Sequence, residues 1–567
     1  MAIDWDVPIT MDDGTVLRAD VFRPADPGRY PAVMTMGPYA KGLAFQEAYA
    51  SNWQRMITAY PEVAEGTSNA YQNWEVVDPE KWVPSGYVCV RVDSRGAGRS
   101  PGFLDVFSPR ETKDFYDCIE WGAEQDWCNG KIGLLGISYY AMNQWQVAAL
   151  RPPHLAAICV WEGAADYYRD AARHGGILSE FLQSWYPRQV LSVQHGVGKR
   201  GPESRATGEL VAGPETLSEQ ELAANRADPG QELANRPLLD DYYTDRTADL
   251  SKITVPLLSA GNWGGQGLHP RGNLEGYLAA ASEQKWLEMH GDTHFSPFYT
   301  DHGIALQKQF FGHFLKGDDT GWLDRPPVEL QVRHPGERFV ARAEQEWPLA
   351  RTRWTKYYLD PVRMGLDTAT CTGPDLSYQT TGDGLTFSTP RLTTDLEITG
   401  PSAAKLTLSS ETSDADVFVA LRVFDPQDEE VLFIGSNDPR VPVGLGWLRA
   451  SHRKLDPHRS LPYRPIHSHD ELWPLEPGTP VELDIEIWPT CIVIPAGYRL
   501  GLTIRGRDYE HESVELPGAA YPMNGVGPFL HNHPEDRPPK IFSTTNTLHF
   551  AEGEAPYVLL PVIPLRV

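Results

Sequence analysis

The sequence predicts an α/β protein with a parallel sheet covered by helices, a helical segment inserted into it, and a C-terminal β domain. Three observations predict this. Short runs rich in Val, Ile and Leu recur through the first 300 residues, and runs apolar on both faces are typical of parallel strands buried between helices. A polar, helix-prone stretch then interrupts the rhythm. After about residue 325, alternating runs separated by Pro, Gly and Asp indicate an antiparallel β-sandwich or jelly roll.

The α/β core is expected over residues 1–165 and 250–325. Its strands are predicted at Ala32–Gly37, Val88–Asp93, Ile132–Gly136, Ala156–Trp161, Val255–Gly261 and Lys285–His290. Between two of them, residues 111–125 carry apolar side chains at helical spacing. This alternation of strand and helix favours a parallel sheet.

Residues 166–249 are expected to form a helical cap over the site, because long insertions in such folds commonly carry function. A capping-box pattern at Ser218–Glu221 supports a helix there. The aromatic stretch 181–186 suits either an acyl or leaving-group pocket or the packing of the cap itself. The jelly roll is expected over residues 326–567, with strands at Val328–Val332, Lys405–Leu408, Val417–Val423, Val481–Ile487, Leu500–Ile504 and Tyr557–Val562.

The amino-acid composition limits the kinds of molecule that the protein is expected to bind. The 567 residues include 50 Lys and Arg against 76 Asp and Glu, a formal charge of −26, which disfavours nucleic acid and anionic membranes. The N-terminus lacks the pattern of a signal peptide, and no apolar run is long enough to span a bilayer. Six scattered cysteines indicate reduced core thiols. A cytoplasmic protein without a cofactor is expected, and the sequence leaves open whether it forms a homodimer.

The strongest local signal is the segment 131–142, Lys-Ile-Gly-Leu-Leu-Gly-Ile-Ser-Tyr-Tyr-Ala-Met. An apolar strand runs into Gly136-x-Ser138 and a helix-like stretch follows, which is the context of a nucleophile elbow. The pattern is half met, because Tyr140 stands where a glycine is usual. The alternative is an ordinary strand-to-helix turn with Ser138 as an N-cap.

A second turn supports the catalytic interpretation. The strand ending at Asp93 continues as Asp-x-Arg-Gly-x-Gly-x-Ser to Ser100, a pattern frequent in α/β-hydrolases. The distance of about 45 residues to Ser138 leaves room for one helix and one strand. The alternative, a nucleotide-binding glycine loop, lacks the spacing of the known phosphate-binding motifs.

Together these motifs resemble the CocE/NonD hydrolases, the acyl esterases related to cocaine esterase and to X-Pro dipeptidyl-peptidases of the S15 type. The resemblance covers almost the whole length. It is carried by Asp13-Gly14 through Arg23-Pro24, Val92 through Gly102, Glu120-Trp121 through Gly130-Lys131, Gly136-x-Ser138-Tyr139, and Tyr168-Arg169-Asp170 with Gly175-Gly176. The resemblance implies an α/β-hydrolase core, a helical cap and a C-terminal jelly roll.

It also implies acyl transfer to a serine, with roles for particular residues. Ser138 would be the nucleophile. His294, which follows the last core strand and a glycine, would be the general base, whereas His290 would end the strand. The oxyanion hole would use the backbone N–H of Tyr139 and, as in this family, a tyrosine hydroxyl, here that of Tyr39.

The acid is the one departure, because the aspartate expected in the family is Gly265 here. Glu162, at the end of the preceding strand, would preserve the chain order serine, acid, histidine. A buried carboxylate bracing the cap through Arg169 is the other interpretation of Glu162. Further candidates for the acid are Asp166, Asp292 and Glu288, or a dyad in which a carbonyl, amide or water holds the imidazole.

Four functions remain open from the sequence. The first is a serine esterase or amidase acting on a small-molecule ester or amide. The second is an X-Pro dipeptidyl-peptidase, which would need an acidic subsite that the sequence does not locate. The third is an acyltransferase, and the fourth is a non-catalytic ligand-binding relative. Metal binding at His467-x-His469 or His531-x-His533 is disfavoured, because no supporting ligand spacing is present.

Overall fold

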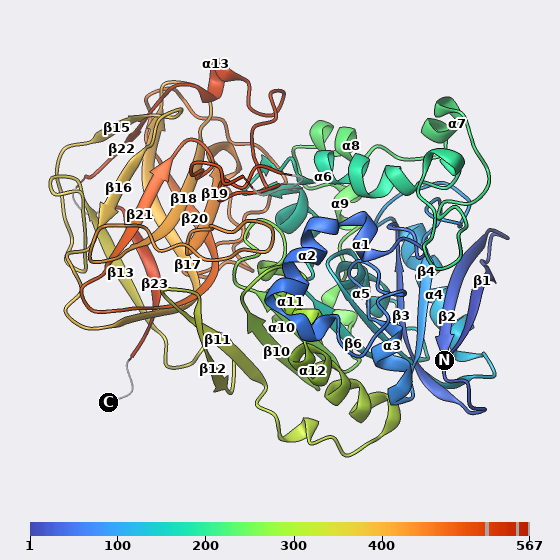
Figure 1. Ribbon diagram of the computed structural model, residues 1–567. Coiled ribbons are helices and arrows are strands. Elements are labelled where there is room, and N and C mark those ends of the chain that lie inside the picture. Colours follow the sequence, from blue (N-terminus) through green and yellow to red (C-terminus); the bar gives the residue numbers. More distant parts are fainter. Residues whose placement is uncertain (516–520, 552–554, 565–567) are drawn as a thin grey trace.

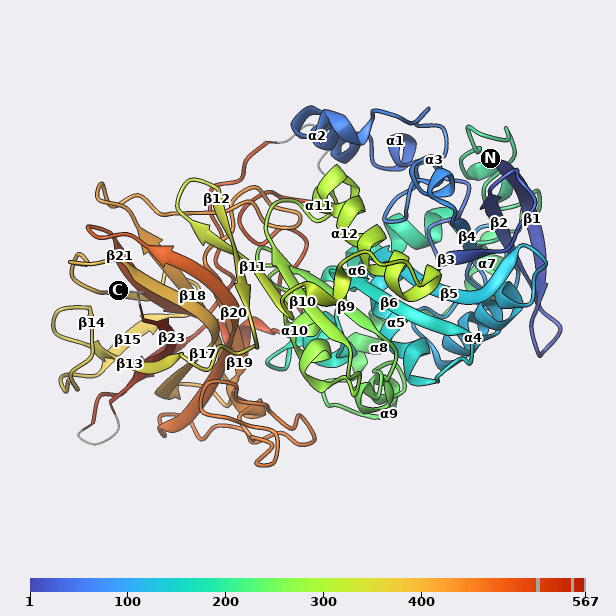
Figure 2. The ribbon, with the colours of Figure 1, turned by 90° about the horizontal axis from the view of Figure 1, so that it is seen from below.

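The computed structural model describes residues 1–515, 521–551 and 555–564. The chain folds into an α/β part, which contains most of the first 330 residues, and a β-rich part beside it (Figures 1 and 2). Within the described residues, no helix has both the length and the apolar character needed to cross a bilayer. The six cysteines are all free, as the sequence predicts, and five of them are buried, whereas Cys371 is partly exposed and is not the core thiol that was expected.

One mixed sheet forms the α/β part. Neighbouring strands run in the order β1 (Ala2–Thr10), β2 (Val16–Arg23), β4 (Val88–Asp93), β3 (Tyr30–Gly37), β5 (Cys128–Ile137), β6 (Leu155–Trp161), β9 (Leu257–Asn262), β10 (Lys285–His290), β11 (Val328–His334) and β12 (Arg338–Glu344). Pairing is parallel from β4 to β11 and antiparallel at both edges. All six predicted core strands are therefore confirmed, and parallel strands bring their carboxyl ends to one edge, where a site can form.

The helices of this part connect the strands. They are α1 (Phe45–Ala48), α2 (Ala50–Ala59), α3 (Pro79–Trp82), α4 (Pro109–Ala123), α5 (Tyr139–Ala149), α10 (Pro270–Ala279), α11 (Ser296–Tyr299) and α12 (Asp301–Phe311). The predicted helix over 111–125 is α4, which begins two residues earlier because the Ser108 hydroxyl accepts a hydrogen bond from the Glu111 N–H and caps it.

The segment between β6 and β9 contains short helices and one small hairpin. These are α6 (Phe181–Trp185), α7 (Glu219–Ala224), α8 (Pro229–Asn235) and α9 (Asp241–Thr244), with strands β7 (Arg173–His174) and β8 (Ile177–Leu178). The predicted capping box at Ser218 and Glu221 is present at the start of α7. Tyr167, Leu182 and Trp185 of this segment share one hydrophobic cluster with Tyr39 and Tyr139 of the core. The insertion therefore packs directly over the nucleophile turn.

The C-terminal part is built from antiparallel pairs around its own apolar core. Its strands are β13 (Arg353–Asp360), β14 (Gly365–Asp367), β15 (Leu376–Gln379), β16 (Leu385–Ser388), β17 (Leu396–Ser410), β18 (Asp416–Phe424), β19 (Gly444–Arg449), β20 (Val481–Ile494), β21 (Arg499–Arg505), β22 (Thr545–Leu548) and β23 (Tyr557–Ile563), with the helix α13 (Pro539–Phe542). The long strand β17 pairs with β20, β22 and β23.

One predicted strand joins the two parts, since β11 pairs with β20 of the β part as well as with β10. The run at 328–332, assigned from the sequence to the β domain, forms β11, which pairs in parallel with β10 and extends the α/β sheet. Its alternation of polar and apolar residues reflects its position near the sheet edge, where one face is less covered.

Buried ion pairs join the insertion, the core and the β part. Arg271 at the start of α10 is 2.8 Å from Asp170 of the insertion and 3.0 Å from Glu486 on β20. Arg173 and Arg449 both contact Asp536. Removing one member of such a group leaves an uncompensated buried charge, which costs several kcal/mol, about 3–5. These contacts therefore fix the three segments around the site.

Candidate active site

Ser138 sits on a sharp turn between β5 and α5, with φ of 57° and ψ of −111°. A non-glycine residue at positive φ is strained and needs support from its surroundings. The Ser138 N–H donates to the Trp161 carbonyl at 3.1 Å, which ties the turn to β6. The residue is 8% exposed, so it lies at a site largely closed to water.

Tyr140, the residue that departs from the usual elbow pattern, is accommodated by two glycines. A Cβ on Gly37 would lie 2.5 Å from Tyr140 Cε1, and a Cβ on Gly136 would lie 2.4 Å from Tyr140 Cβ. The space that a glycine at +2 usually provides is thus supplied by Gly37 at the end of β3 and Gly136 on β5.

Tyr139 is held by its side chain so that its backbone is fixed. Its hydroxyl donates to Glu111 Oε2 at 2.5 Å, and its ring stacks on Phe107 with centroids 4.1 Å apart. Its N–H is the first of α5, and the first N–H groups of a helix have no partner inside it. This N–H therefore has no partner within α5 and is next to Ser138 in the chain.

Tyr39 lies beside the nucleophile turn and is buried. Its ring packs edge-to-face against Tyr139 and Tyr140, and its hydroxyl oxygen accepts a hydrogen bond from Trp185 Nε1 at 3.0 Å. Burial, with the nearby negative charge of Glu75, raises the pKa of the Tyr39 hydroxyl well above its usual range. The group therefore stays protonated and keeps its own O–H to donate.

A small cavity of about 20 Å³ lies at Ser138, with space for one water. Its walls are mainly apolar and aromatic and come from the core and the insertion; they are Tyr39, Phe107, Tyr139, Met142, Tyr167, Ala171, Phe181, Leu182, Trp185 and Leu268. Phe181, Leu182 and Trp185, from the aromatic stretch noted in the sequence, thus line this cavity as well as packing within the insertion.

His294 lies in the loop after β10, and its two ring nitrogens contact carboxylates. Its Nδ1 is 2.7 Å from Glu162 Oε2, and its Nε2 is 2.9 Å from Glu75 Oε1. Burial alone would lower the pKa of His294, but these two carboxylates outweigh it and raise the pKa to about 10. The imidazole is therefore cationic at neutral pH in this arrangement.

Glu162 is fully buried at the end of β6, with φ of 51°. Besides His294, its carboxylate contacts His290 Nε2 at 3.3 Å and accepts from the Ser436 hydroxyl at 3.2 Å and from Asn262 Nδ2 at 3.3 Å. Burial would raise its pKa, but the two imidazoles lower the pKa to about 2. Glu162 is thus an ionised carboxylate surrounded by donors. Arg169, its other candidate partner, pairs with Asp166 instead.

The remaining acid candidates bind other groups. Asp166 contacts Arg169 at 2.8 Å, Asp292 accepts from the Tyr60 hydroxyl, and Glu288 contacts His290 Nδ1 at 2.7 Å. Gly265 is closely surrounded: a Cβ there would lie 3.0 Å from Ser436 Oγ and 3.1 Å from Pro270 Cδ. The place of the family aspartate is therefore occupied by neighbours, while Glu162 reaches His294 from the adjacent strand.

Two residues at the site were missed from the sequence. His269, at the start of α10, places its Nε2 3.2 Å from Ser138 Oγ, and its ring stacks on His294 with centroids 5.1 Å apart and an interplanar angle of 7°. Burial, with the charge of His294, lowers the pKa of His269 to about 3, so this ring is neutral. Its Nδ1 is buried without a hydrogen-bond partner among the described residues.

Glu75 is the second of these residues. It lies at φ of 64° in the irregular stretch before α3, and its carbonyl accepts from the N–H of Ile137, next to Ser138. Burial raises the pKa of its carboxyl group. The loop after β9 is where the family aspartate is expected, and a histidine in that loop could have drawn attention to His269. Nothing in the sequence around Glu75 marks it.

The Asp93 motif is structural. The Asp93 carboxylate accepts from the N–H groups of Lys41 at 2.6 Å and Arg99 at 2.8 Å, and a Cβ on Gly98 would come within 2.3 Å of it. This turn therefore closes the end of β4 on itself.

The sheet order, the serine on a turn at positive φ and the carboxylate–imidazole pair are those of a hydrolase fold with a serine on the turn after β5. Comparison with known families agrees with this. Residues 13–296 match the family described as X-Pro dipeptidyl-peptidase (S15 family), and residues 320–559 match the X-Pro dipeptidyl-peptidase C-terminal non-catalytic domain. The chain therefore belongs to the S15 family of hydrolases.

Individual relatives extend the match over nearly the whole chain. A crystal structure of a CocE/NonD family hydrolase from Staphylococcus aureus superimposes with a TM-score of 0.84 at 30% identity, covering 99% of this chain and 93% of the other. Cocaine esterase of a Rhodococcus species is 26% identical over 72% of this chain and 78% of its own length. A candidate serine esterase of Mycobacterium bovis is 26% identical over 90% and 91%.

Proposed function

We propose that this protein is a serine esterase that cleaves a small acyl ester, or an amide, through an acyl-enzyme on Ser138. The observation that carries the proposal is the position of the Ser138 hydroxyl. It lies on a strained turn, 3.2 Å from Nε2 of His269, in a small, mainly apolar cavity whose lining includes Tyr39 and Tyr139. The names of the relatives, an esterase among them, point the same way.

In the proposed first step, Glu75 takes the Nε2 proton of the resting His294 imidazolium, and Ser138 Oγ attacks the ester carbonyl carbon while its own proton passes to the freed Nε2. The carbonyl π electrons move to oxygen, which the Tyr139 N–H and the Tyr39 O–H then stabilise. The tetrahedral intermediate collapses, the C–O bond to the alcohol breaks, and the imidazolium returns its proton to the leaving oxygen. Water repeats these steps on the acyl-enzyme and releases the acid.

Glu162 has the role of the orienting acid in this scheme. An acceptor on Nδ1 fixes the tautomer that leaves Nε2 free to exchange protons, and it stabilises the imidazolium. The 2.7 Å contact of Glu162 with Nδ1 of His294 supports this assignment. Glu75, on the other nitrogen, would take the Nε2 proton of the resting imidazolium, and its raised pKa suits that exchange.

His269 is a second candidate for the base, favoured by its direct contact with Ser138 Oγ. Two observations favour His294 over it. His269 has no partner on Nδ1, among the described residues, to fix its tautomer, and a pKa lowered to about 3 makes its ring a weak proton acceptor near neutral pH. We therefore assign His269 to holding the serine hydroxyl in place.

In the same proposal, residues 166–249 act as the cap that shapes the acyl or leaving-group pocket, residues 1–165 and 250–325 form the α/β-hydrolase core, and residues 326–567 form a jelly roll. The support for the cap is that Tyr167, Leu182 and Trp185 line the cavity at Ser138. The small apolar cavity favours a small, uncharged acyl group.

A fluorophosphonate probe tests the central claim. The wild-type chain should be labelled at Ser138 and lose activity on a nitrophenyl ester, whereas Ser138→Ala should be neither labelled nor active. An unlabelled wild-type chain would indicate a non-catalytic relative and overturn the proposal. Comparing a nitrophenyl ester with an X-Pro nitroanilide then separates esterase from dipeptidyl-peptidase activity, and an added alcohol that raises product formation would indicate acyl transfer.

A further inference from the structure

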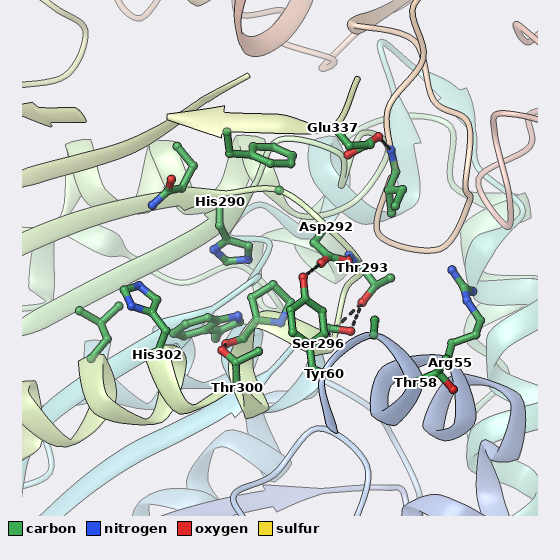
Figure 3. A pocket seen from close by; sticks show the side chains of 18 of the residues that line it. Arg55, Thr58, Tyr60, His290, Asp292, Thr293, Ser296, Thr300, His302 and Glu337 are labelled. Atoms are coloured by element: carbon green, nitrogen blue, oxygen red, sulfur yellow. Dashed lines mark hydrogen bonds between the residues drawn. The ribbon is translucent and has the colours of Figure 1, made fainter. Parts of the chain in front are cut away.

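A second, much larger cavity lies on another side of the catalytic residues. It has a volume of about 1250 Å³, above the range of typical small-molecule sites. Its walls come from α2, from the loop between β10 and α11, from the start of α12, and from the turn before β12 (Figure 3). Ile434 of the β part also lines it.

This cavity is separate from the one at Ser138. Among the described residues, the two cavities share no lining residue, and Ser138, Tyr39, His269 and His294 do not line the larger one. The two approach each other only through the wall: His290 lines the large cavity and contacts Glu162, which in turn contacts His294.

Much of the wall is apolar. Trp161, Leu306 and Phe339 contribute large apolar surfaces, with Pro297, Ile434, Ala50 and Ala59 around them. Apolar area removed from water contributes about 25 cal/mol per Å². A ligand with an aromatic or branched aliphatic body therefore gains from entering.

The acidic groups of the cavity are already satisfied. Asp292 accepts from the Tyr60 hydroxyl, Glu288 contacts His290, and Glu337 accepts from the Ile434 N–H. Figure 3 shows the first and third of these as dashed lines. None of these carboxylates needs a ligand cation to complete its contacts.

Arg55 is different. Its half-buried guanidinium rises from α2 on the far side of the cavity from His290 (Figure 3). In the part of the chain that the structure describes, it makes no hydrogen bond or close ion pair, and Asp292 and Asp438 act on it only as more distant negative charges. A partly desolvated guanidinium with five free N–H donors is the geometry that receives a carboxylate, often through two hydrogen bonds.

We propose that this cavity binds an amphipathic organic carboxylate, with its carboxylate on Arg55 and its apolar body against Trp161, Leu306 and Phe339. The guanidinium, which has no hydrogen-bonded partner among the described residues, selects the charge of the ligand, and the apolar walls select its body. The inference concerns a site apart from Ser138 and does not depend on the esterase activity.

Calorimetric titration of the full-length Ser138→Ala chain with 4-phenylbutyrate tests it, with the uncharged 4-phenylbutyramide as the matched ligand. We expect saturable binding of one carboxylate, about tenfold tighter than that of the amide, as one charge-assisted pair predicts. Arg55→Met, which keeps an apolar stem, should weaken binding of the carboxylate to the affinity of the amide and leave the affinity of the amide unchanged. Arg391→Met, an exposed arginine of the β part, is the control and should change neither.

Ala59→Trp, which fills the cavity, should abolish binding of both ligands, and its thermal unfolding curve reports whether it folds. Wild-type protein labelled at Ser138 with a fluorophosphonate should bind the carboxylate as the unlabelled chain does. The proposal is overturned if neither ligand binds, if Arg55→Met leaves the preference for the carboxylate intact, or if labelling at Ser138 removes binding. The last result would place the ligand in the catalytic cavity.

Discussion

Replacing Glu162 with glutamine tests the assignment of the catalytic acid most directly. The substitution keeps the shape of the side chain but removes its charge and places an amide against His294 and His290. An amide nitrogen at the 2.7 Å contact with His294 Nδ1 would favour the wrong imidazole tautomer. When the orienting acid of a serine triad is neutralised in this way, kcat falls by about 10⁴-fold.

The expected magnitude also includes a change in stability. The pKa of Glu162 is lowered from 4.5 to about 2. A tenfold change in an ionisation equilibrium corresponds to about 1.4 kcal/mol, so the ionised form contributes about 3 kcal/mol to the free energy of unfolding. Because the folded-state pKa is the lower one, this contribution is present above pH 4.5 and is lost as the pH falls toward 2. The Glu162→Gln chain should therefore unfold more easily at neutral pH, with the difference shrinking in acid.

The assay is steady-state hydrolysis of a nitrophenyl ester, with chemical denaturation measured in parallel. Asp292→Asn is the matched control, since Asp292 also lies near His294 in the sequence but contacts Tyr60; its kcat should change little. Near wild-type kcat in a folded Glu162→Gln chain would refute the assignment, and a large loss in Asp292→Asn alone would transfer the role to that residue.

Three further changes test the neighbouring groups. Tyr39→Phe should lower kcat by about 10²–10³-fold with little change in KM, since it removes one oxyanion donor; an unchanged rate would exclude Tyr39 from the oxyanion hole. His294→Asn should lower kcat by about 10⁴-fold or more and His269→Asn by far less, and the reverse order in the same ester assay would make His269 the base. Since a pKa of about 10 keeps His294 protonated, kcat/KM should rise into the alkaline range. Glu75→Gln should move that rise to lower pH. An unchanged pH profile in Glu75→Gln would show that Glu75 does not affect the protonation of the base.

The α/β core is predictable from the sequence because its strands are continuous apolar runs. Val88–Asp93 and Lys285–His290 match β4 and β10 at both ends. The strand predicted at 328–332, β11, pairs with β10 of the α/β part and with β20 of the β part, and its alternating pattern does not encode the first of these pairings. That depends on its neighbour β10, with which it pairs only after folding.

At the site, local motifs are informative and long-range contacts are not. Ser138, Tyr139 and Tyr39 follow strands in patterns that the sequence displays. Glu75 and His269 are missed because their roles arise from contacts 219 residues apart for Glu75 with His294 and 131 for His269 with Ser138. A carboxylate in an irregular loop has no periodicity that would indicate its partner.

The structure gives a physical reason for the absence of an aspartate at 265. A Cβ at Gly265 would lie 3.0 Å from Ser436 Oγ, and that hydroxyl donates to Glu162. A carboxylate at 265 would compete for the donors of Glu162 and place a second negative charge beside it, so the two acids exclude each other. Gly265→Asp alone should therefore lower both activity and the unfolding midpoint. Combined with Glu162→Gln it should restore part of the lost kcat, because the aspartate then has His294 to itself. If the double variant is no more active than Glu162→Gln, position 265 cannot reach the imidazole, and the exclusion argument fails.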